Sequence, residues 1–188
     1  MNTKIETYSG RFFDYLNQSQ FDMDPPSIAH ALGNICRYTG HSRFFYSVAA
    51  HSLLCEEIAH MRELSLRVRL LCLVHDAHEA YVGDVNTPLK LAMNGAFFAI
   101  ESNAEAVAHS VLSVPLPSLA DRHTVKCVDL IALATEAYCL MPSRGIGWNI
   151  PEKPVAGIRV ECLQPEEGAA KWLNTYRVMM LQLHGSDL

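Results

Sequence analysis

Four polar residues lie inside or directly after apolar stretches and belong to the types that bind divalent metal ions: His51, His75, Asp76 and Asp129. Each one alone is also compatible with a hydrogen-bonded core histidine or a solvent-facing aspartate. Together they need a different explanation, because an unpaired charge in an apolar interior is strongly destabilising. Two imidazoles and two carboxylates provide the mixed nitrogen and oxygen ligands of a divalent ion and leave positions for water and phosphate. The sequence therefore predicts a metal centre.

The spacing of these residues requires several helices to meet. Neighbouring residues of one helix point about 100° apart, so His75 and Asp76 cannot surround an ion by themselves. His51 from one neighbouring helix and Asp129 from another must complete the ligand set. The core of a helical bundle provides such an arrangement.

The elements that carry these residues are predicted to be mostly α-helical, in a bundle of about six helices with a minor β element. We treat residues 1–188 as one domain. Apolar spacing, capping residues and the positions of proline and glycine predict helices at 25–38, 47–58, 64–81, 89–112, 123–141 and from 165 onward. A hairpin is expected within residues 7–16, a strand at 158–163 that pairs with it, and irregular chain at 142–157.

Composition excludes several classes of protein. The chain is 49% hydrophobic and 19% charged, which argues against disorder, and its net charge of −5 argues against a protein that coats nucleic acid. It has six cysteines but no C-x-x-C pair, so we expect reduced thiols. Neither a signal pattern nor an apolar run of about 18 residues is present, so the expected location is the cytoplasm, or the host cytoplasm if the protein is viral.

A longer segment around the second histidine resembles a known family. Residues 75–90 read HDAHEAYVGDVNTPLK, which is similar to the HDAxE…GDxxTPxK segment of bacterial 5′-deoxynucleotidases. With His51 before it and Asp129 after it, the chain resembles the H…HD…D signature of HD-domain metal-dependent phosphohydrolases. Residues 28–52 resemble a compact phage and prophage branch, which includes dATP triphosphohydrolases of viruses that replace adenine with 2-aminoadenine. The resemblance covers residues 8–140.

The resemblance implies an HD-domain fold in which His51, His75, Asp76 and Asp129 hold one divalent ion (Co²⁺, Mn²⁺, Zn²⁺ or Mg²⁺). It also allows a second ion bound with the substrate phosphates. The implied catalytic residues are Glu79 and Asp84.

Glu79 follows His75 by four residues, so both are expected on the same helix face. By resemblance Glu79 is the general acid/base that positions the attacking water or protonates the leaving oxygen. The alternative is a surface glutamate. His78 is expected to face outward.

The implied substrate-binding residues are Arg37, Tyr38, His41, Asp84, Thr87 and Lys90. Arg37, Thr87 and Lys90 would bind phosphate oxygens, and Asp84 would accept a hydrogen bond from the sugar 3′-hydroxyl. Tyr38 would border the base or sugar, and His41 would assist phosphate binding or leaving-group protonation. Structural alternatives stay open: a helix-end role for Arg37, a core position for Tyr38, helix capping by Asp84 and a solvated Lys90.

The implied activity is metal-dependent hydrolysis of deoxynucleotides. The favoured form converts dATP, or dNTPs in general, to deoxynucleoside and triphosphate. The alternatives are a 5′-deoxynucleotidase that releases phosphate from dNMP and a non-catalytic HD module that senses nucleotides. The expected partner is a deoxynucleotide, with no nucleic acid and no membrane, and the resemblance implies a homo-oligomer, either a hexamer or a dimer.

Overall fold

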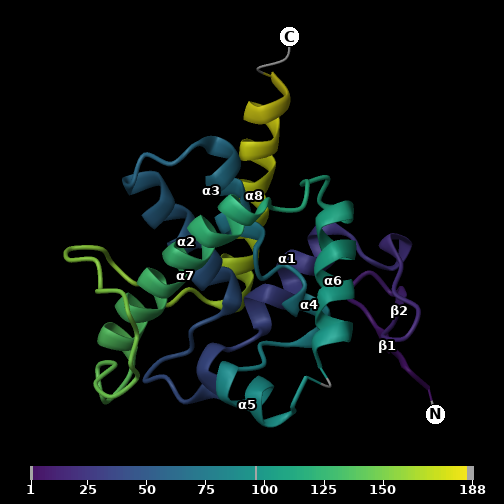
Figure 1. The fold of residues 1–188 in the computed structure, drawn as a ribbon. Helices are drawn as coiled ribbons and strands as arrows, with labels where there is room; N and C mark the ends of the chain where they lie inside the picture. The colour runs from purple at the N-terminus through teal and green to yellow at the C-terminus, as the bar shows by residue number, and fades with distance from the viewer. Residues whose placement is uncertain (1, 96, 186–188) are drawn as a thin grey trace.

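The computed structural model describes residues 2–95 and 97–185, and over these residues the chain is a helical bundle with a small antiparallel hairpin (Figure 1). The elements are β1 (Lys4–Glu6), β2 (Phe12–Asp14), the 3₁₀ turns η1 (Gln20–Asp22) and η2 (Arg37–Gly40), and the helices α1 (Pro25–Asn34), α2 (Val48–Met61), α3 (Leu66–Val74), α4 (Glu79–Val82), α5 (Thr87–Ala92), α6 (Phe98–Val111), α7 (Leu119–Leu140) and α8 (Pro165–Gly185). The predicted fold class is confirmed.

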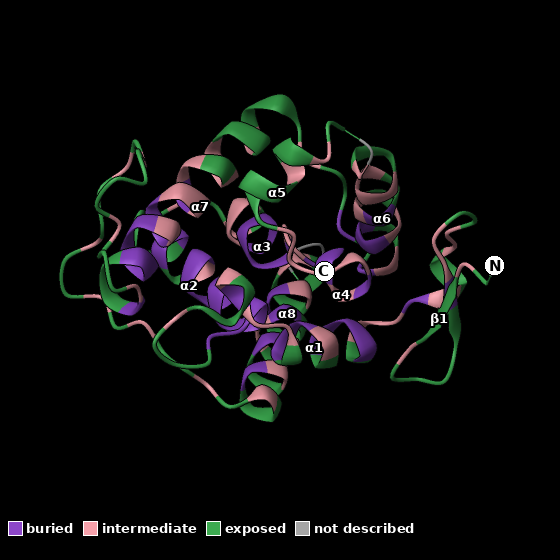
Figure 2. Cartoon of the chain, turned by 90° about the horizontal axis from the view of Figure 1, so that it is seen from below, coloured by how far each residue is buried: buried purple, intermediate pink, exposed green. Residues whose placement is uncertain are grey.

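The core lies where α8 packs against α1, α2 and α3, while α2 and α3 pack against α7 on the other side. Figure 2 shows the buried faces of these helices turned toward one another, whereas α5 is largely exposed. Trp172 of α8 is fully buried and its indole nitrogen donates a hydrogen bond to the Leu73 carbonyl, 3.0 Å away. α1 and α8 approach closely at Gly33, because a methyl group there would collide with the Pro165 carbonyl oxygen. These contacts hold α1 and α3 against α8, and α3 ends directly before the predicted ligands His75 and Asp76.

Side-chain caps explain where several helices begin. Asp24 accepts a hydrogen bond from the backbone of Ser27 at the start of α1, as the sequence predicts. Ser47 caps α2, and Ser118 forms a capping box with Asp121 at the start of α7. These caps satisfy backbone N–H groups that have no partner within the helix. They fix the ends of the two helices that carry His51 and Asp129.

The structure differs from the sequence prediction at residues 158–163, which form no strand. The N-terminal hairpin is present, but β1 and β2 pair only with each other among the described residues, with Ile5 opposite Phe13. Residues 158–163 instead form irregular chain, with Ile158 and Val160 packed on the apolar cluster between α2 and α7. The alternating pattern reflects this one-sided burial, not strand pairing. Residues 142–157 are irregular, as predicted.

Two predicted helices are each divided. The predicted helix 64–81 becomes α3 and α4 with a turn between them, and the predicted helix 89–112 becomes α5 and α6. In the first turn the backbone N–H groups of Ala77 and Glu79 bond to the carbonyls of Val74 and Asp76, three residues back. Such bonds wind the chain more tightly than an α-helix. The tighter turn changes the direction of the side chains around His75.

All six cysteines are free thiols, and Cys55 and Cys72 are buried. Among residues 2–95 and 97–185, no helix combines the length and apolar character needed to cross a membrane.

Candidate metal centre and adjoining cavity

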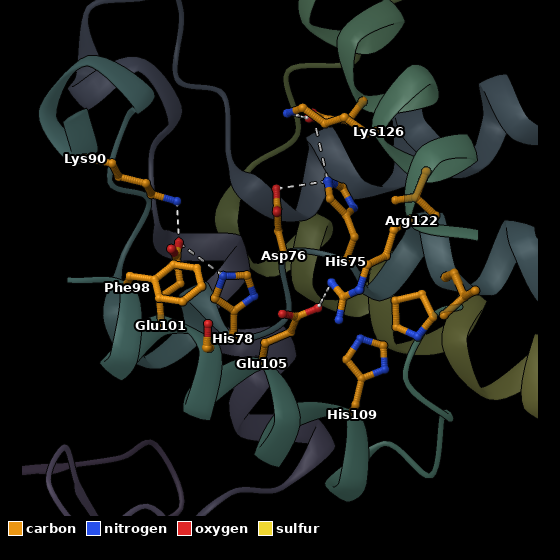
Figure 3. A pocket seen from close by; sticks show the side chains of 15 residues that line it. His75, Asp76, His78, Lys90, Phe98, Glu101, Glu105, His109, Arg122 and Lys126 are labelled. Atoms are coloured by element: carbon orange, nitrogen blue, oxygen red, sulfur yellow. Dashed lines mark hydrogen bonds and ion pairs between the residues drawn. The ribbon is translucent and has the colours of Figure 1, made fainter. Parts of the chain in front are cut away.

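The structure brings the four predicted metal ligands together. His51 comes from α2, His75 and Asp76 from the turn after α3, and Asp129 from α7. His51 Nε2 lies 3.3 Å from Asp129 Oδ1 and 3.5 Å from Asp76 Oδ2. His75 Nε2 lies 3.2 Å from Asp76 Oδ2 and 4.0 Å from Asp129 Oδ1. The adjacent residues His75 and Asp76 converge because the turn replaces regular helix there (Figure 3).

Both histidine rings are anchored through Nδ1. His51 Nδ1 lies 2.5 Å from Glu136 Oε1, and His75 Nδ1 lies 2.8 Å from the Cys72 carbonyl oxygen. Each of these oxygens accepts a hydrogen bond, so Nδ1 carries the proton and the Nε2 lone pair faces the carboxylates in a neutral ring. His75 Nε2 is buried without a hydrogen-bond partner. Metal-ligating histidines are usually oriented in this way by a carboxylate or carbonyl.

The spacing of the donor atoms fits a single ion. Bonds of about 2.0–2.2 Å with the angles of octahedral to tetrahedral coordination place neighbouring nitrogen and oxygen ligands roughly 2.9–3.5 Å apart. Three of the four nitrogen–oxygen distances between the histidines and aspartates lie within this range, at 3.2, 3.3 and 3.5 Å. The residues present therefore fit a divalent cation.

One group of potential ligand atoms includes a residue that the sequence prediction missed. The ligand atoms of His51, Cys55, His75 and Asp129 all lie within 4.8 Å of one another, and this group could hold a metal ion. Burial raises the pKa of the Cys55 thiol to about 11. Cys55 follows His51 by one helical turn on α2, and this spacing was the signal available in the sequence.

The sequence prediction also missed Glu136, which holds the His51 ring through Nδ1, the nitrogen that faces away from the aspartates. It is fully buried and accepts hydrogen bonds from His51, the hydroxyls of Tyr38 and Tyr46, and the Arg37 guanidinium. Burial disfavours its charge, but Arg37 and His51 outweigh this and lower the pKa of Glu136. Glu136 follows Asp129 by seven residues, two turns of one helix, so the sequence places both on one face of α7.

Arg37 lies beside the cluster, buried, with Nε 3.2 Å from Glu136 Oε2 and one terminal nitrogen 3.8 Å from Asp76 Oδ2. The helix-end alternative is wrong, because α1 ends at Asn34 and Arg37 begins η2.

Burial opposes a positive charge on His51, but the surrounding groups, Glu136 and Asp129 among them, raise the pKa of His51 well above its ordinary value. The carboxylates around His51 thus favour positive charge at this position.

Glu79 is the first residue of α4 and is buried, with Oε2 lacking a hydrogen-bond partner. Burial, followed by Asp76 and Asp84, raises the pKa of Glu79 well above its ordinary value. The surface alternative is therefore wrong. The expectation that Glu79 and His75 share one continuous helix is also wrong, because the turn separates them.

Asp84 is half-buried, and burial raises its pKa. It does not cap the next helix, because the Asn86 side chain accepts the Leu89 backbone hydrogen bond at the start of α5. The capping alternative for Asp84 is thus wrong.

A cavity of about 270 Å³ adjoins the cluster (Figure 3). His75, Asp76 and Asp129 line it together with residues of α5, α6 and α7. Three cations line it, and each is paired with a carboxylate: Lys90 with Glu101, Arg122 with Glu105 at 2.8 Å, and Lys126 with Asp129 at 2.7 Å.

Two side chains around this cavity differ from their expected surroundings. The expectation that His78 faces outward is wrong: it is buried, with Nε2 3.6 Å from Glu101 Oε1. Lys90 is half-buried and ion-paired, so it is not a solvated lysine.

Three predicted substrate-binding residues stand apart from the metal cluster. The Tyr38 hydroxyl donates to Glu136 Oε2 at 2.5 Å, and the centre of its ring lies 5.5 Å from the Arg37 guanidinium carbon, so this side chain contacts the neighbours of the predicted ligands. Tyr38, Thr39 and Gly40 have left-handed backbone angles, with φ of 57°, 52° and 78°. His41 and Thr87 are exposed. Within the described part of the chain, neither of these two side chains forms a hydrogen bond or ion pair with the cluster.

Comparisons with known proteins identify relatives of the whole chain. No family model matches it. It is 36% identical over 148 residues to the uncharacterized protein YfdR of Escherichia coli (strain K12), which covers 79% of this chain and 78% of YfdR. It is also 31% identical over 188 aligned residues to the uncharacterized protein RCAP_rcc00048 of Rhodobacter capsulatus, with 94% and 95% of the two chains covered. The chain therefore belongs to the family of YfdR.

Proposed function

We propose that this chain is a metal-dependent phosphohydrolase of the HD type that acts on deoxynucleotides. Its favoured reaction is the hydrolysis of dATP, or of dNTPs in general, to deoxynucleoside and triphosphate. The observation that carries the proposal is the convergence of His51, His75, Asp76 and Asp129 beside a cavity, with both histidines anchored at Nδ1. These residues would hold a divalent ion, which would polarise a phosphoryl oxygen and lower the pKa of a bound water.

The chain's own residues supply the remaining chemistry. Arg37 lies beside the cluster, and its planar fork suits two oxygens of the reacting phosphate. Glu79 is buried with one carboxyl oxygen free of hydrogen bonds, which suits proton transfer to the leaving 5′-oxygen or orientation of the attacking water. Asp84 lies near enough to Arg37 and Asp76 to interact with them electrostatically. In this position its carboxylate can accept a hydrogen bond from the sugar 3′-hydroxyl.

Room and positive charge beyond the reacting phosphate distinguish a triphosphate substrate from a monophosphate. The cavity next to the cluster offers that room, and Lys90, Arg122 and Lys126 line it, which supports the triphosphate reaction. Each of these cations is already paired with a carboxylate, which offsets part of the positive charge that outer phosphates would need. This pairing favours the second candidate, a 5′-deoxynucleotidase that needs no outer-phosphate site.

The test separates these products directly. Purified protein is loaded in turn with Co²⁺, Mn²⁺, Zn²⁺ and Mg²⁺ and incubated with each dNTP, NTP and dNMP, and nucleoside, phosphate and triphosphate are resolved by chromatography. Triphosphate from dATP supports the favoured reaction, and phosphate from dNMP alone supports the second candidate. Absence of turnover with every ion refutes both, and nucleotide binding in that case identifies a sensing module.

Asp129→Ala is expected to abolish metal content and turnover together, because Asp129 contacts both histidines of the cluster. Elemental analysis and the product assay measure the two effects on the same sample. Asp22→Ala is the matched control, because Asp22 lies in η1, outside the cluster. Full activity of Asp129→Ala would show that the ligand assignment is wrong.

A further inference from the structure

A buried thiol lies on the metal-facing side of His51. Cys55 is 1% exposed, and its Sγ lies 3.5 Å from His51 Nε2 but 3.9 Å from Nδ1. Nδ1 is already occupied by Glu136, whereas Nε2 faces Asp76 and Asp129. The sulfur is therefore nearer to the nitrogen that would bind an ion.

Helix geometry keeps the sulfur in this place. Cys55 and His51 are one turn apart in the middle of α2, so their side chains lie on the same face of a continuous helix. The buried apolar residues Leu54, Ile58 and Cys72 belong to the cluster around Cys55. Because Cys55 and His51 belong to one helix and Cys55 is packed among buried apolar side chains, the distance between the sulfur and the imidazole is fixed by the fold.

The distance between the two donor atoms matches a shared ion. Bonds of about 2.0–2.1 Å to nitrogen and about 2.3 Å to sulfur, with the angles of octahedral to tetrahedral coordination, place the two ligands roughly 3.1–3.6 Å apart. The observed separation is 3.5 Å. His75 and Asp129 complete the group with donor atoms that all lie within 4.8 Å of one another.

A second His–Cys pair in the chain shows that this spacing alone makes no site. Cys127 follows His123 by one turn of α7, with Sγ 3.8 Å from Nε2. No second histidine or carboxylate joins this pair in a potential metal-binding group among the described residues. What distinguishes Cys55 is the set of ligands around it.

We propose that Cys55 is a sulfur ligand of the metal ion, in addition to the two histidines and the two aspartates. This inference rests on the metal centre of the proposed function. On binding, the thiol proton leaves to solvent and sulfur donates an electron pair to the ion, with no change of oxidation state. Thiolate favours Zn²⁺ and Co²⁺ over Mg²⁺ and Mn²⁺, which prefer oxygen ligands. The centre is thus selective for the softer ions.

The test uses the full chain loaded with Co²⁺, whose bond to a thiolate gives a charge-transfer absorption band in the near ultraviolet. We expect this band in the wild type and in the control Cys127→Ala, and its loss in Cys55→Ala and Cys55→Ser. Chelator competition gives the affinities: Zn²⁺ binding is expected to weaken about tenfold or more in both Cys55 variants, with a much smaller change for Mn²⁺.

The wild-type spectrum tests the proposal even if a variant does not fold. Bound Co²⁺ without the band, or a band that survives in Cys55→Ala, overturns the assignment of Cys55. Product release is measured in the same samples: turnover without the band overturns the ligand but retains the phosphohydrolase. The band without turnover under any substrate supports the ligand and overturns the proposed function.

Discussion

Glu136→Gln is the substitution whose effect the structure defines most closely. Oε2 of Glu136 receives Arg37 Nε at 3.2 Å and the Tyr38 hydroxyl at 2.5 Å, and Oε1 lies 2.5 Å from His51 Nδ1. Arg37 can only donate, so the glutamine oxygen must take the Oε2 position. The amide NH₂ then faces His51 and donates to Nδ1. The ring proton moves to Nε2, where it occupies the lone pair that would bind the ion.

The expected losses of stability and of metal affinity follow from the removed charge of Glu136 and from the changed tautomer of His51. Removing one partner of a buried ion pair costs about 3–5 kcal/mol, which lowers the melting temperature of a chain of this size by roughly 6–20 °C. Loss of an outer partner of a metal-bound histidine lowers metal affinity about 10–100-fold. Because the tautomer itself is reversed, we expect the upper end, about 100-fold or about 2.7 kcal/mol.

Thermal unfolding of chelator-treated protein, followed by circular dichroism, measures the first effect. Competition with a chelating dye for Zn²⁺ measures the second. Glu161→Gln is the matched control, because Glu161 is 43% exposed and pairs with Lys171 at the surface, a contact worth about 0–1 kcal/mol. A Glu136→Gln protein that melts and binds Zn²⁺ like the wild type would refute this reasoning.

Two further substitutions separate chemistry from packing. Glu79→Gln is expected to keep its metal content and lose about 10²–10⁴-fold in turnover, as product release and elemental analysis would show, because the proton-transferring group is removed; loss of the metal instead would place Glu79 among the ligands. Gly33→Ala is expected to destabilise the fold by about 1–3 kcal/mol in urea unfolding, because its methyl group meets the Pro165 carbonyl, whereas Gly185→Ala has open space and should change little. Equal stability of these two variants would contradict the close packing of α1 on α8.

The metal cluster was predictable because its residues break an apolar pattern. His51, His75 and Asp129 stand where a helix would otherwise bury apolar side chains, and a charge there requires a partner. Glu136 occupies an equally apolar run, but its identity as an anchor depends on Tyr38, Tyr46 and Arg37 arriving from distant parts of the chain. Spacing along one helix cannot show which side chains another segment brings to it.

The failed predictions have a common physical origin in tertiary contacts. Residues 158–163 alternate like a strand, but Ile158 and Val160 pack on the apolar cluster between α2 and α7, and within the described residues the hairpin has only the strands β1 and β2. Residues 64–81 have helical spacing throughout, yet a turn interrupts the helix at His75 and Asp76. In this turn the N–H groups of Ala77 and Glu79 bond to carbonyls three residues back, those of Val74 and Asp76. The spacing of apolar residues indicates which face of a segment is buried. The backbone conformation of that segment also depends on the tertiary contacts that bury it.

The left-handed backbone at Tyr38 and Thr39 links the metal centre to the segment that precedes α2. Each non-glycine residue in this conformation costs about 1–2 kcal/mol, so the two hold roughly 2–4 kcal/mol of strain. The Tyr38 hydroxyl bonds to the same Glu136 carboxylate that orients His51. One carboxylate thus restrains a strained loop and sets the direction of the candidate metal ligand His51. Because both the loop and His51 are held by Glu136, a change that breaks the hydrogen bonds of Glu136 is expected to release the strained backbone of Tyr38 and Thr39 and the orientation of His51 together.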